Sequence, residues 1–223
     1  MSIKLFVQAI IKFSLGIVIM GLFLFLPAGT LNYWNAWLLL GLLFIPMFIV
    51  GIVLMIKNPE LLKKRLNAKE KEKEQKEVLI GSAFMFISGF LLAGFNYRYQ
   101  WFILPNIVVI ISSILFVLSY ILYAEVLREN TYLSRTIEVQ KDQKVIATGL
   151  YGIVRHPMYS TTIILFLSMP LILGSIFSFL LFLIYPFLIS KRIKNEEEVL
   201  EKELKDYKKY KEKVKYKMIP FIW

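Results

Sequence analysis

Four long stretches of the sequence carry no charged side chain: residues 13–56, 78–97, 99–124 and 156–190. The hydrocarbon core of a bilayer is about 30 Å thick, and a helix needs about 20 residues to cross it. Each stretch is long enough to do so, and a soluble fold has no means of solvating runs of this kind. The pattern predicts an all-α fold, a polytopic transmembrane helical bundle.

Turn residues divide these stretches into six predicted helices. The first four cover residues 5–26, 34–56, 78–95 and 105–124. Pro170 and Gly174-Ser175 interrupt the last stretch, which predicts a tight helical hairpin over residues 157–190 rather than one long span. An interfacial aromatic belt is predicted at the start of the second helix, at Tyr33, Trp34 and Trp37.

Basic residues are concentrated in three polar segments. Residues 57–77 hold eight, residues 125–155 hold five and residues 191–223 hold eleven, whereas the loops at the opposite ends of the helices hold only Arg98. Because cytoplasmic loops carry an excess of Lys and Arg, both termini and all three segments are predicted to be cytoplasmic.

Two of these segments contain further helix signals. Asn58-Pro59-Glu60 provides an N-cap, a proline at the first helical position and an acid in the first turn. The charge run at 69–77 is predicted to be a solvated face. Apolar residues of the tail recur at helical spacing, which predicts an amphipathic cytoplasmic tail helix lying on the membrane; they are Leu200, Leu204, Tyr207 and Val214.

Composition excludes several kinds of site and partner. The chain has no cysteine and one histidine among 223 residues, which excludes disulfides, thiolate metal sites and histidine clusters, and no metal site is predicted. The mean hydropathy is +0.62 and the net charge is +11. In a membrane protein that charge reflects the cytoplasmic face and its contact with lipid headgroups, so membrane lipids are expected partners and nucleic acid is not. The sequence leaves the oligomeric state open.

Two short motifs flank the predicted hairpin, T-G-L-Y-G-I-V-R-H-P-M-Y at 148–159 and R-I-K-N-E-E at 192–197. A hairpin brings its two ends together, so these motifs should meet at one cytoplasmic mouth. Each charged residue alone has an ordinary structural interpretation, but ionisable groups gathered at a membrane boundary indicate a functional site. The chain is therefore divided into a four-helix transmembrane region, 1–124, and a catalytic region of loop, hairpin and tail helix, 125–223.

The string G-L-Y-x-x-V-R-H-P-M-Y, a broken apolar hairpin, then R-I-x-N-E-E-x-x-L and Y-x-x-Y-x-x-x-V resembles the isoprenylcysteine carboxyl methyltransferase family. The wider group includes phospholipid N-methyltransferases, and the resemblance covers residues 139–223. It implies an enzyme that uses S-adenosyl-L-methionine, releases S-adenosyl-L-homocysteine and methylates a prenylated cysteine or another lipidic small molecule.

The resemblance also assigns residues. It implies that Arg192 contacts the acceptor as the catalytic residue, with Arg155 and Glu197 as candidates for a supporting role. The implied cofactor-binding residues are Gln140, Gln143, Val145, Ile146, Tyr151, His156, Pro157, Met158, Tyr159 and Glu196.

Elementary chemistry agrees with this assignment. Glu196 can accept hydrogen bonds from a ribose or amino group, His156 can bond a carboxylate, and Tyr151 suits a flat adenine. A carboxylate acceptor is already ionised near pH 7 and needs no general base, whereas an amine must first lose its proton. Phospholipid N-methylation, a non-enzymatic scaffold or transporter, and a membrane reductase with a nicotinamide cofactor remain as alternatives.

Overall fold

The computed structural model describes residues 3–66, 73–134 and 139–223, and within them the chain is helical without β-strands. The helices are α1 (Ile3–Ala28), α2 (Trp34–Lys57), α3 (Pro59–Leu66), α4 (Lys73–Tyr99), α5 (Asn106–Glu129), the short 3₁₀ helix η1 (Gly149–Gly152), α6 (Pro157–Ile172), α7 (Ile176–Phe182), α8 (Tyr185–Glu203) and α9 (Tyr207–Lys213). The predicted all-α class is confirmed.

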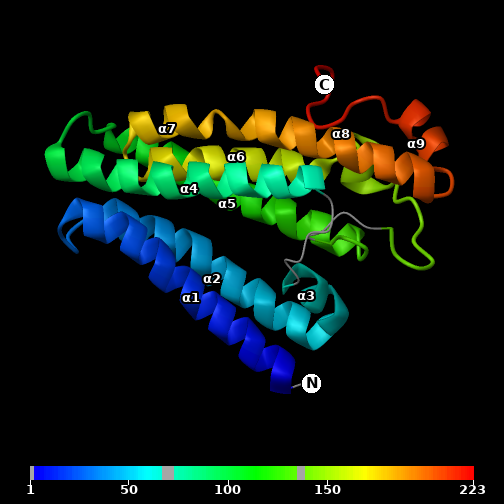
Figure 1. Ribbon diagram of the computed structural model, residues 1–223, viewed down its shortest axis with the longest axis horizontal. Coiled ribbons are helices and arrows are strands. Elements are labelled where there is room, and N and C mark those ends of the chain that lie inside the picture. The colour runs from blue at the N-terminus through cyan, green and yellow to red at the C-terminus, as the bar shows by residue number, and fades with distance from the viewer. Residues whose placement is uncertain (1–2, 67–72, 135–138) are drawn as a thin grey trace.

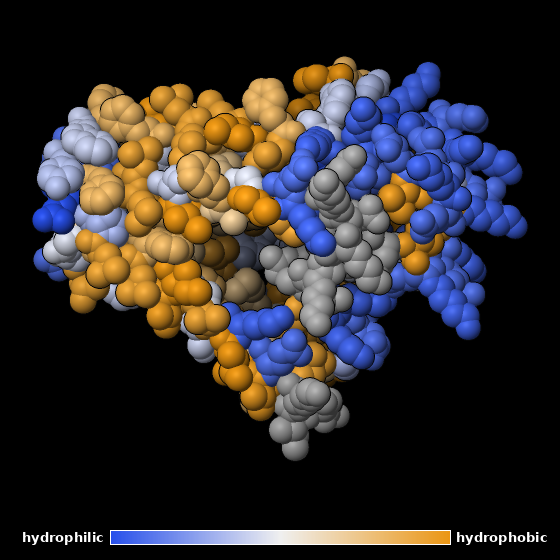
Figure 2. Space-filling model, in the orientation of Figure 1, coloured by the Kyte–Doolittle hydropathy of each residue, from blue (hydrophilic) through white to orange (hydrophobic). Residues whose placement is uncertain are grey.

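Five helical stretches are long and apolar enough to cross a membrane: α1, α2, α4, α5 and the continuous stretch Ile176–Glu203. Figure 2 shows the consequence, an apolar band over most of the molecule and a charged end beyond it. The chain is an integral membrane protein with several spans.

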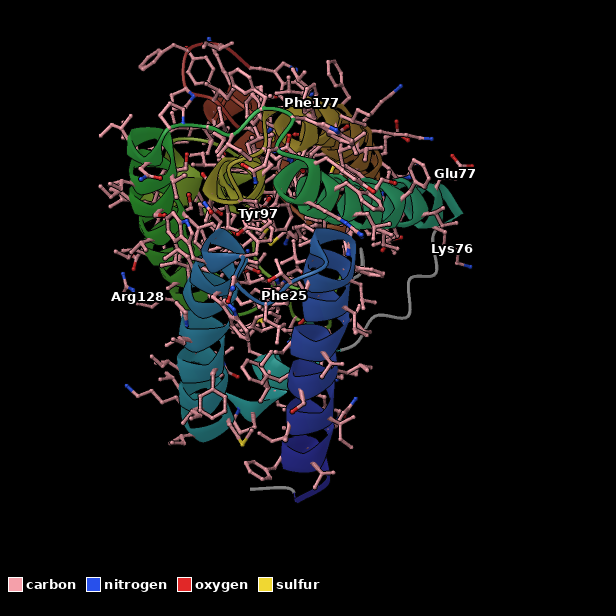
Figure 3. The ribbon with its side chains drawn as sticks, turned by 90° about the vertical axis from the view of Figure 1, so that its left-hand side faces the viewer. Phe25, Lys76, Glu77, Tyr97, Arg128 and Phe177 are labelled. Atoms are coloured by element: carbon pink, nitrogen blue, oxygen red, sulfur yellow. The ribbon has the colours of Figure 1, made fainter. Side chains whose placement is uncertain are left out.

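The helices form two unequal groups (Figure 1). Helices α4 to α8 lie nearly parallel in one bundle, while α1 and α2 lean away from it as a two-helix arm that ends at α3. Figure 3 views the bundle along its length and places Phe25 between the two helices of the arm, where its ring lies 4.8 Å from that of Trp37. The arm therefore has its own small apolar contact surface.

The predicted hairpin is present and runs the full length of the bundle. Its first helix, α6, rises about 24 Å, and its tip lies at Gly174, whose φ of +74° suits a residue without a side chain. The amide of Leu104 donates to the Gly174 carbonyl over 3.1 Å, so the tip pairs with the loop between α4 and α5. The same geometry returns the two ends of the hairpin to the charged end of the molecule.

Three local predictions need correction. Tyr33 does not belong to an aromatic belt, because it is fully buried and donates to the Leu173 carbonyl over 2.6 Å, whereas Trp34 and Trp37 are about half exposed. The charge run at 69–77 is not simply a solvated face: residues 69–72 lie outside the described part, but α4 already begins at Lys73. Its Gln75 is fully buried and donates to the Asn195 side chain over 2.8 Å.

The tail is the third correction. Helix α8 continues from the membrane part to Glu203, and the chain then reverses at Asp206 (φ +64°) into α9. The apolar face of this region does not lie on a membrane surface, because Tyr207, Tyr210 and Val214 pack against Val139, Val145 and Leu200. These apolar residues instead hold the loop that precedes η1.

Candidate active site

A pocket opens at the charged end of the bundle, between residues 130–134, residues 143–146, η1, the start of α6, and helices α8 and α9. Its wall contains most of the site residues that the sequence analysis assigned: Gln143, Val145, Ile146, Tyr151, Arg155, His156, Met158, Tyr159, Arg192 and Glu196. The hairpin thus brings the two motifs together as predicted.

Helix α8 contributes one stripe of side chains to this pocket. Arg192, Glu196 and Leu200 recur every four residues on α8 and line it together, and Leu204, directly after the helix, lines it as well. Side chains at this spacing lie one above another on a helix. The stripe changes from charged to apolar along its length, so one wall of the pocket offers both kinds of contact.

Tyr159 of α6 joins the two charged residues of the stripe. The Arg192 Nε donates to the Tyr159 hydroxyl over 2.8 Å, and that hydroxyl donates to Glu196 Oε2 over 2.6 Å. Hydrogen bonds with an ionised partner are among the stronger ones in proteins. The chain of contacts fixes the guanidinium and the carboxylate on the same side of the pocket.

Glu197 has a different environment from its neighbour. It is 4% exposed, and its Oε1 accepts from Arg155 Nε at 2.7 Å and lies 3.1 Å from His156 Nε2. Lys211 of α9 approaches its other oxygen at 3.4 Å. This buried cluster ties α8 to the turn before α6, behind the pocket wall, and it occupies one nitrogen of the histidine.

The segment after α9 covers the same turn. The backbone amides of Arg155 and His156 donate to the carbonyls of Tyr216 and Lys217 over 2.9 and 2.8 Å. The Arg155 Nη1 donates to the carbonyls of Val214 and Lys215, each over 2.7 Å. Arg155 is buried and therefore links the turn before α6 to residues 214–218 by hydrogen bonds. We call residues 214–218 the strap.

Three predicted site residues are not part of the pocket wall. Pro157 occupies the buried first position of α6, and Glu197 lies behind the wall. Gln140 holds the loop instead: its side chain donates to the Tyr132 carbonyl over 2.6 Å and accepts from Lys64 over 2.5 Å. The sequence alone did not distinguish residues that hold the loop in its conformation from residues that line the pocket.

Other wall residues were not predicted as site residues: Asn130, Tyr132, Leu133, Ser134, Leu200, Leu204, Tyr207 and Tyr210. The repeated tyrosines of Y-x-x-Y were a usable signal. The Tyr210 hydroxyl donates to the Tyr151 carbonyl over 2.7 Å, and Asn130 donates to the Tyr151 hydroxyl over 3.1 Å. Burial raises the pKa of Tyr151, Tyr207 and Tyr210, so all three hydroxyls keep their protons at neutral pH.

The start of η1 depends on a glycine. Gly149 has a φ of +50°, and a Cβ added there would lie 1.7 Å from Glu129 Oε1. The same carboxylate accepts from the Leu150 amide over 3.1 Å. The glycine therefore lets Glu129 hold the turn that presents Tyr151 to the pocket.

Helix α3 supports the pocket from the side of the arm. Asn58 caps it as predicted, accepting from the Leu61 amide over 3.1 Å. Arg65 donates to the Tyr123 hydroxyl and, over 3.3 Å, to the Ser134 carbonyl, and it lies 3.8 Å from the Met158 sulfur. The polar segment between α2 and α4 is thereby part of the support of the site.

Within the described ranges, no three His, Cys, Asp or Glu side chains are placed to hold a metal ion. The pocket instead offers a carboxylate, a guanidinium, a histidine, tyrosine rings and aliphatic side chains. This set suits an organic ligand with an aromatic ring and charged groups.

Comparison with known protein families gives a match. No curated protein sequence matches the chain. Residues 102–207 match the family model described as phospholipid methyltransferase, and this range begins before α5 and reaches the first residue of α9. The resemblance inferred from the two motifs is confirmed at the level of this wider family: residues 102–207, just under half of the chain, match its model, and the family includes isoprenylcysteine carboxyl methyltransferases and other membrane methyltransferases.

Proposed function

We propose that this protein transfers a methyl group from S-adenosylmethionine to a carboxylate on a lipidic acceptor, as isoprenylcysteine carboxyl methyltransferases do. The observation that carries the proposal is the contact chain from Arg192 through Tyr159 to Glu196 in the pocket wall. It places the residue implied for the acceptor beside a residue implied for the cofactor.

The pocket residues fit S-adenosylmethionine. Tyr151, Val145 and Ile146 offer flat or apolar surface to an adenine, and Glu196 offers acceptor oxygens to ribose hydroxyls or an amino group. When bound, the cofactor supplies an electrophilic methyl group on a sulfonium sulfur. The carboxylate of Glu196 also favours a cationic ligand at this wall.

Arg192 would hold the acceptor. It is 8% exposed, lines the pocket and is oriented through its Nε by Tyr159. A guanidinium can bind a carboxylate through paired, charge-assisted hydrogen bonds. Catalysis would rest on alignment and on exclusion of water, because a carboxylate needs no deprotonation.

The acceptor would be a lipid that approaches sideways from the membrane. The space-filling view is hollowed between the arm and the bundle, within the apolar band and next to the charged end (Figure 2). We propose the cytoplasm as the side on which the pocket opens, since the basic segments lie at that end.

Phospholipid N-methylation is the second candidate, and the description of the matched family favours it. An ammonium acceptor would be repelled by Arg192 and would need a base to remove its proton. These two requirements separate the candidates by experiment.

Calorimetric titration of the purified protein with S-adenosylhomocysteine tests the cofactor. We expect binding by the wild type, with affinity about tenfold lower or worse in Glu196→Gln, since a charge-assisted hydrogen bond contributes about 1.5–3 kcal/mol. Glu198→Gln, an exposed position on the same helix, is the matched control. Absence of binding by the wild type would remove the proposal.

A methyl-transfer assay with farnesylcysteine and with phosphatidylethanolamine tests the acceptor. We expect turnover of the carboxylate and its selective loss in Arg192→Ala. Turnover of the amine alone would assign the protein to the second candidate. An equal loss of turnover with both acceptors in Arg192→Ala would contradict the role proposed for Arg192.

A further inference from the structure

The strap ends in a turn whose two most exposed side chains are apolar. Phe221 is 86% exposed and Ile222 is 78% exposed. We call residues 219–223 the apolar turn. Side chains of this size are rarely left to water on a rigid segment, so their surroundings need an explanation.

The apolar turn has a defined conformation. Its two sides are joined by backbone hydrogen bonds, from Met218 and Ile219 to the Trp223 carbonyl over 2.9 and 3.0 Å, and from Ile222 and Trp223 to the Ile219 carbonyl over 3.2 and 3.1 Å. Phe221 adopts a φ of +66°, a conformation that bulky residues avoid. One side of the turn is fixed, because Met218 is buried in the main core and Trp223 packs against it. The other side presents Phe221 and Ile222 outward.

The position of the turn identifies what covers it. In Figure 1 the marked C end lies at the outer edge of the molecule beside α8, and Figure 2 shows apolar side chains at that edge where the apolar band meets the charged end. Basic side chains accompany it: Lys213 and Lys215 are exposed, and the Lys217 ammonium lies 4.7 Å from the centre of the Trp223 ring. Aromatic and apolar residues next to lysines are typical of a bilayer interface with anionic headgroups.

We propose that the apolar turn inserts Phe221 and Ile222 into the acyl chains at the bilayer interface and that this insertion seats the strap on the turn before α6. The connection is direct. The strap carbonyls accept from the Arg155 and His156 amides, and the Met218 carbonyl accepts from the Ser160 hydroxyl over 2.7 Å. The partner is the lipid surface, and the consequence reaches the pocket wall through Arg155 and His156.

The absence of cysteine from the sequence makes the insertion measurable. Spin labels are attached to the full chain at Phe221→Cys or Ile222→Cys in proteoliposomes that contain an anionic lipid. We expect both labels to be reached by oxygen rather than by a water-soluble nickel complex, as at Ile45→Cys on the exposed face of α2. Lys213→Cys, an exposed neighbour of the strap, should show the reverse.

Water accessibility at positions 221 and 222 equal to that at 213 would overturn the proposal. Protection from both reagents would also overturn it, because a protein partner rather than lipid would then cover the turn. The measurement needs no cofactor, so its result is separate from the outcome for the proposed methyl transfer.

The connection to the site has its own test. Asparagine tolerates the left-handed backbone of Phe221, so the double variant Phe221→Asn, Ile222→Asn removes the apolar side chains while the turn is kept. We expect the amides of Arg155 and His156 to exchange with deuterium several-fold faster in bilayers, because their acceptors lie on the strap. Unchanged exchange at both amides would show that the strap is seated without the membrane. Lys213→Asn serves as the matched control.

Discussion

Only 11% of the apolar stretch of α1 is buried inside the protein, whereas 33% of that of α4 and of the α7–α8 stretch is buried. The stretches of α2 and α5 are alike at 22%, so the contrast is between α1, which presents most of its apolar side chains to lipid, and helices α4, α7 and α8, which pack more within the bundle. Ion pairs follow the same division, since the buried ones among the described residues lie at the charged end of the bundle.

This difference separates two sources of stability. A side chain facing lipid gains little from folding, because lipid tails are as apolar as the protein interior. A buried charge loses its hydration and depends fully on its partners. The site should thus respond strongly to single substitutions and the arm weakly.

The largest effect is expected at Glu197. Glu197→Ala leaves Arg155 buried without its carboxylate, which should lower the free energy of unfolding by roughly 3–5 kcal/mol. Unfolding in mixed micelles measures it, with exposed Glu198→Ala as the control. Equal effects at 197 and 198 would contradict the distinction between the two adjacent acids.

Gly149→Ala should follow. Its added Cβ would meet the Glu129 carboxylate in a left-handed conformation, so the side chain must move and release the Leu150 amide. We expect a loss of about 2 kcal/mol from backbone strain and one charge-assisted hydrogen bond together. Gly51→Ala in the arm is the control, because nothing lies within 4 Å of a Cβ there. A loss in both variants would point to a general cost of alanine rather than to the turn.

The sequence predicted the features that depend on local patterns along the chain, and it missed the hydrogen bonds between distant segments. Hydropathy placed the spans, and Pro170 with Gly174 placed the hairpin, because both signals are local. The hairpin then brought Tyr159 to Arg192 without further information. The burial of Tyr33 and Gln75 and the strap on Arg155 depend on single hydrogen bonds between distant segments, and no local pattern specifies such partners.

The arm contacts the site at Arg65, so the difference between the arm and the bundle is smallest there. Arg65→Met keeps the apolar part of the side chain but removes the donors to Tyr123 and Ser134. We expect the free energy of unfolding to fall by about 1.5 kcal/mol, as for loss of a charge-assisted hydrogen bond. Lys63→Met, exposed on the same helix, should have little effect. If both variants behave alike, α3 does not support the pocket loop and the arm is independent of the site.

The smallest effect is expected on the outer face of the arm. Ile45 is 63% exposed, whereas Leu165 on α6 is 5% exposed in the core. Leu165→Ala should cost about 2–5 kcal/mol through the cavity it leaves, and Ile45→Ala less than about 0.5 kcal/mol, because lipid replaces the lost methyl groups. Unfolding of both variants in mixed micelles and in bilayers measures the contrast. A cost at Ile45 in bilayers that approaches the cost at Leu165 would mean that a protein surface covers the arm, and the contrast between a lipid-held arm and a self-packed bundle would fail at that face.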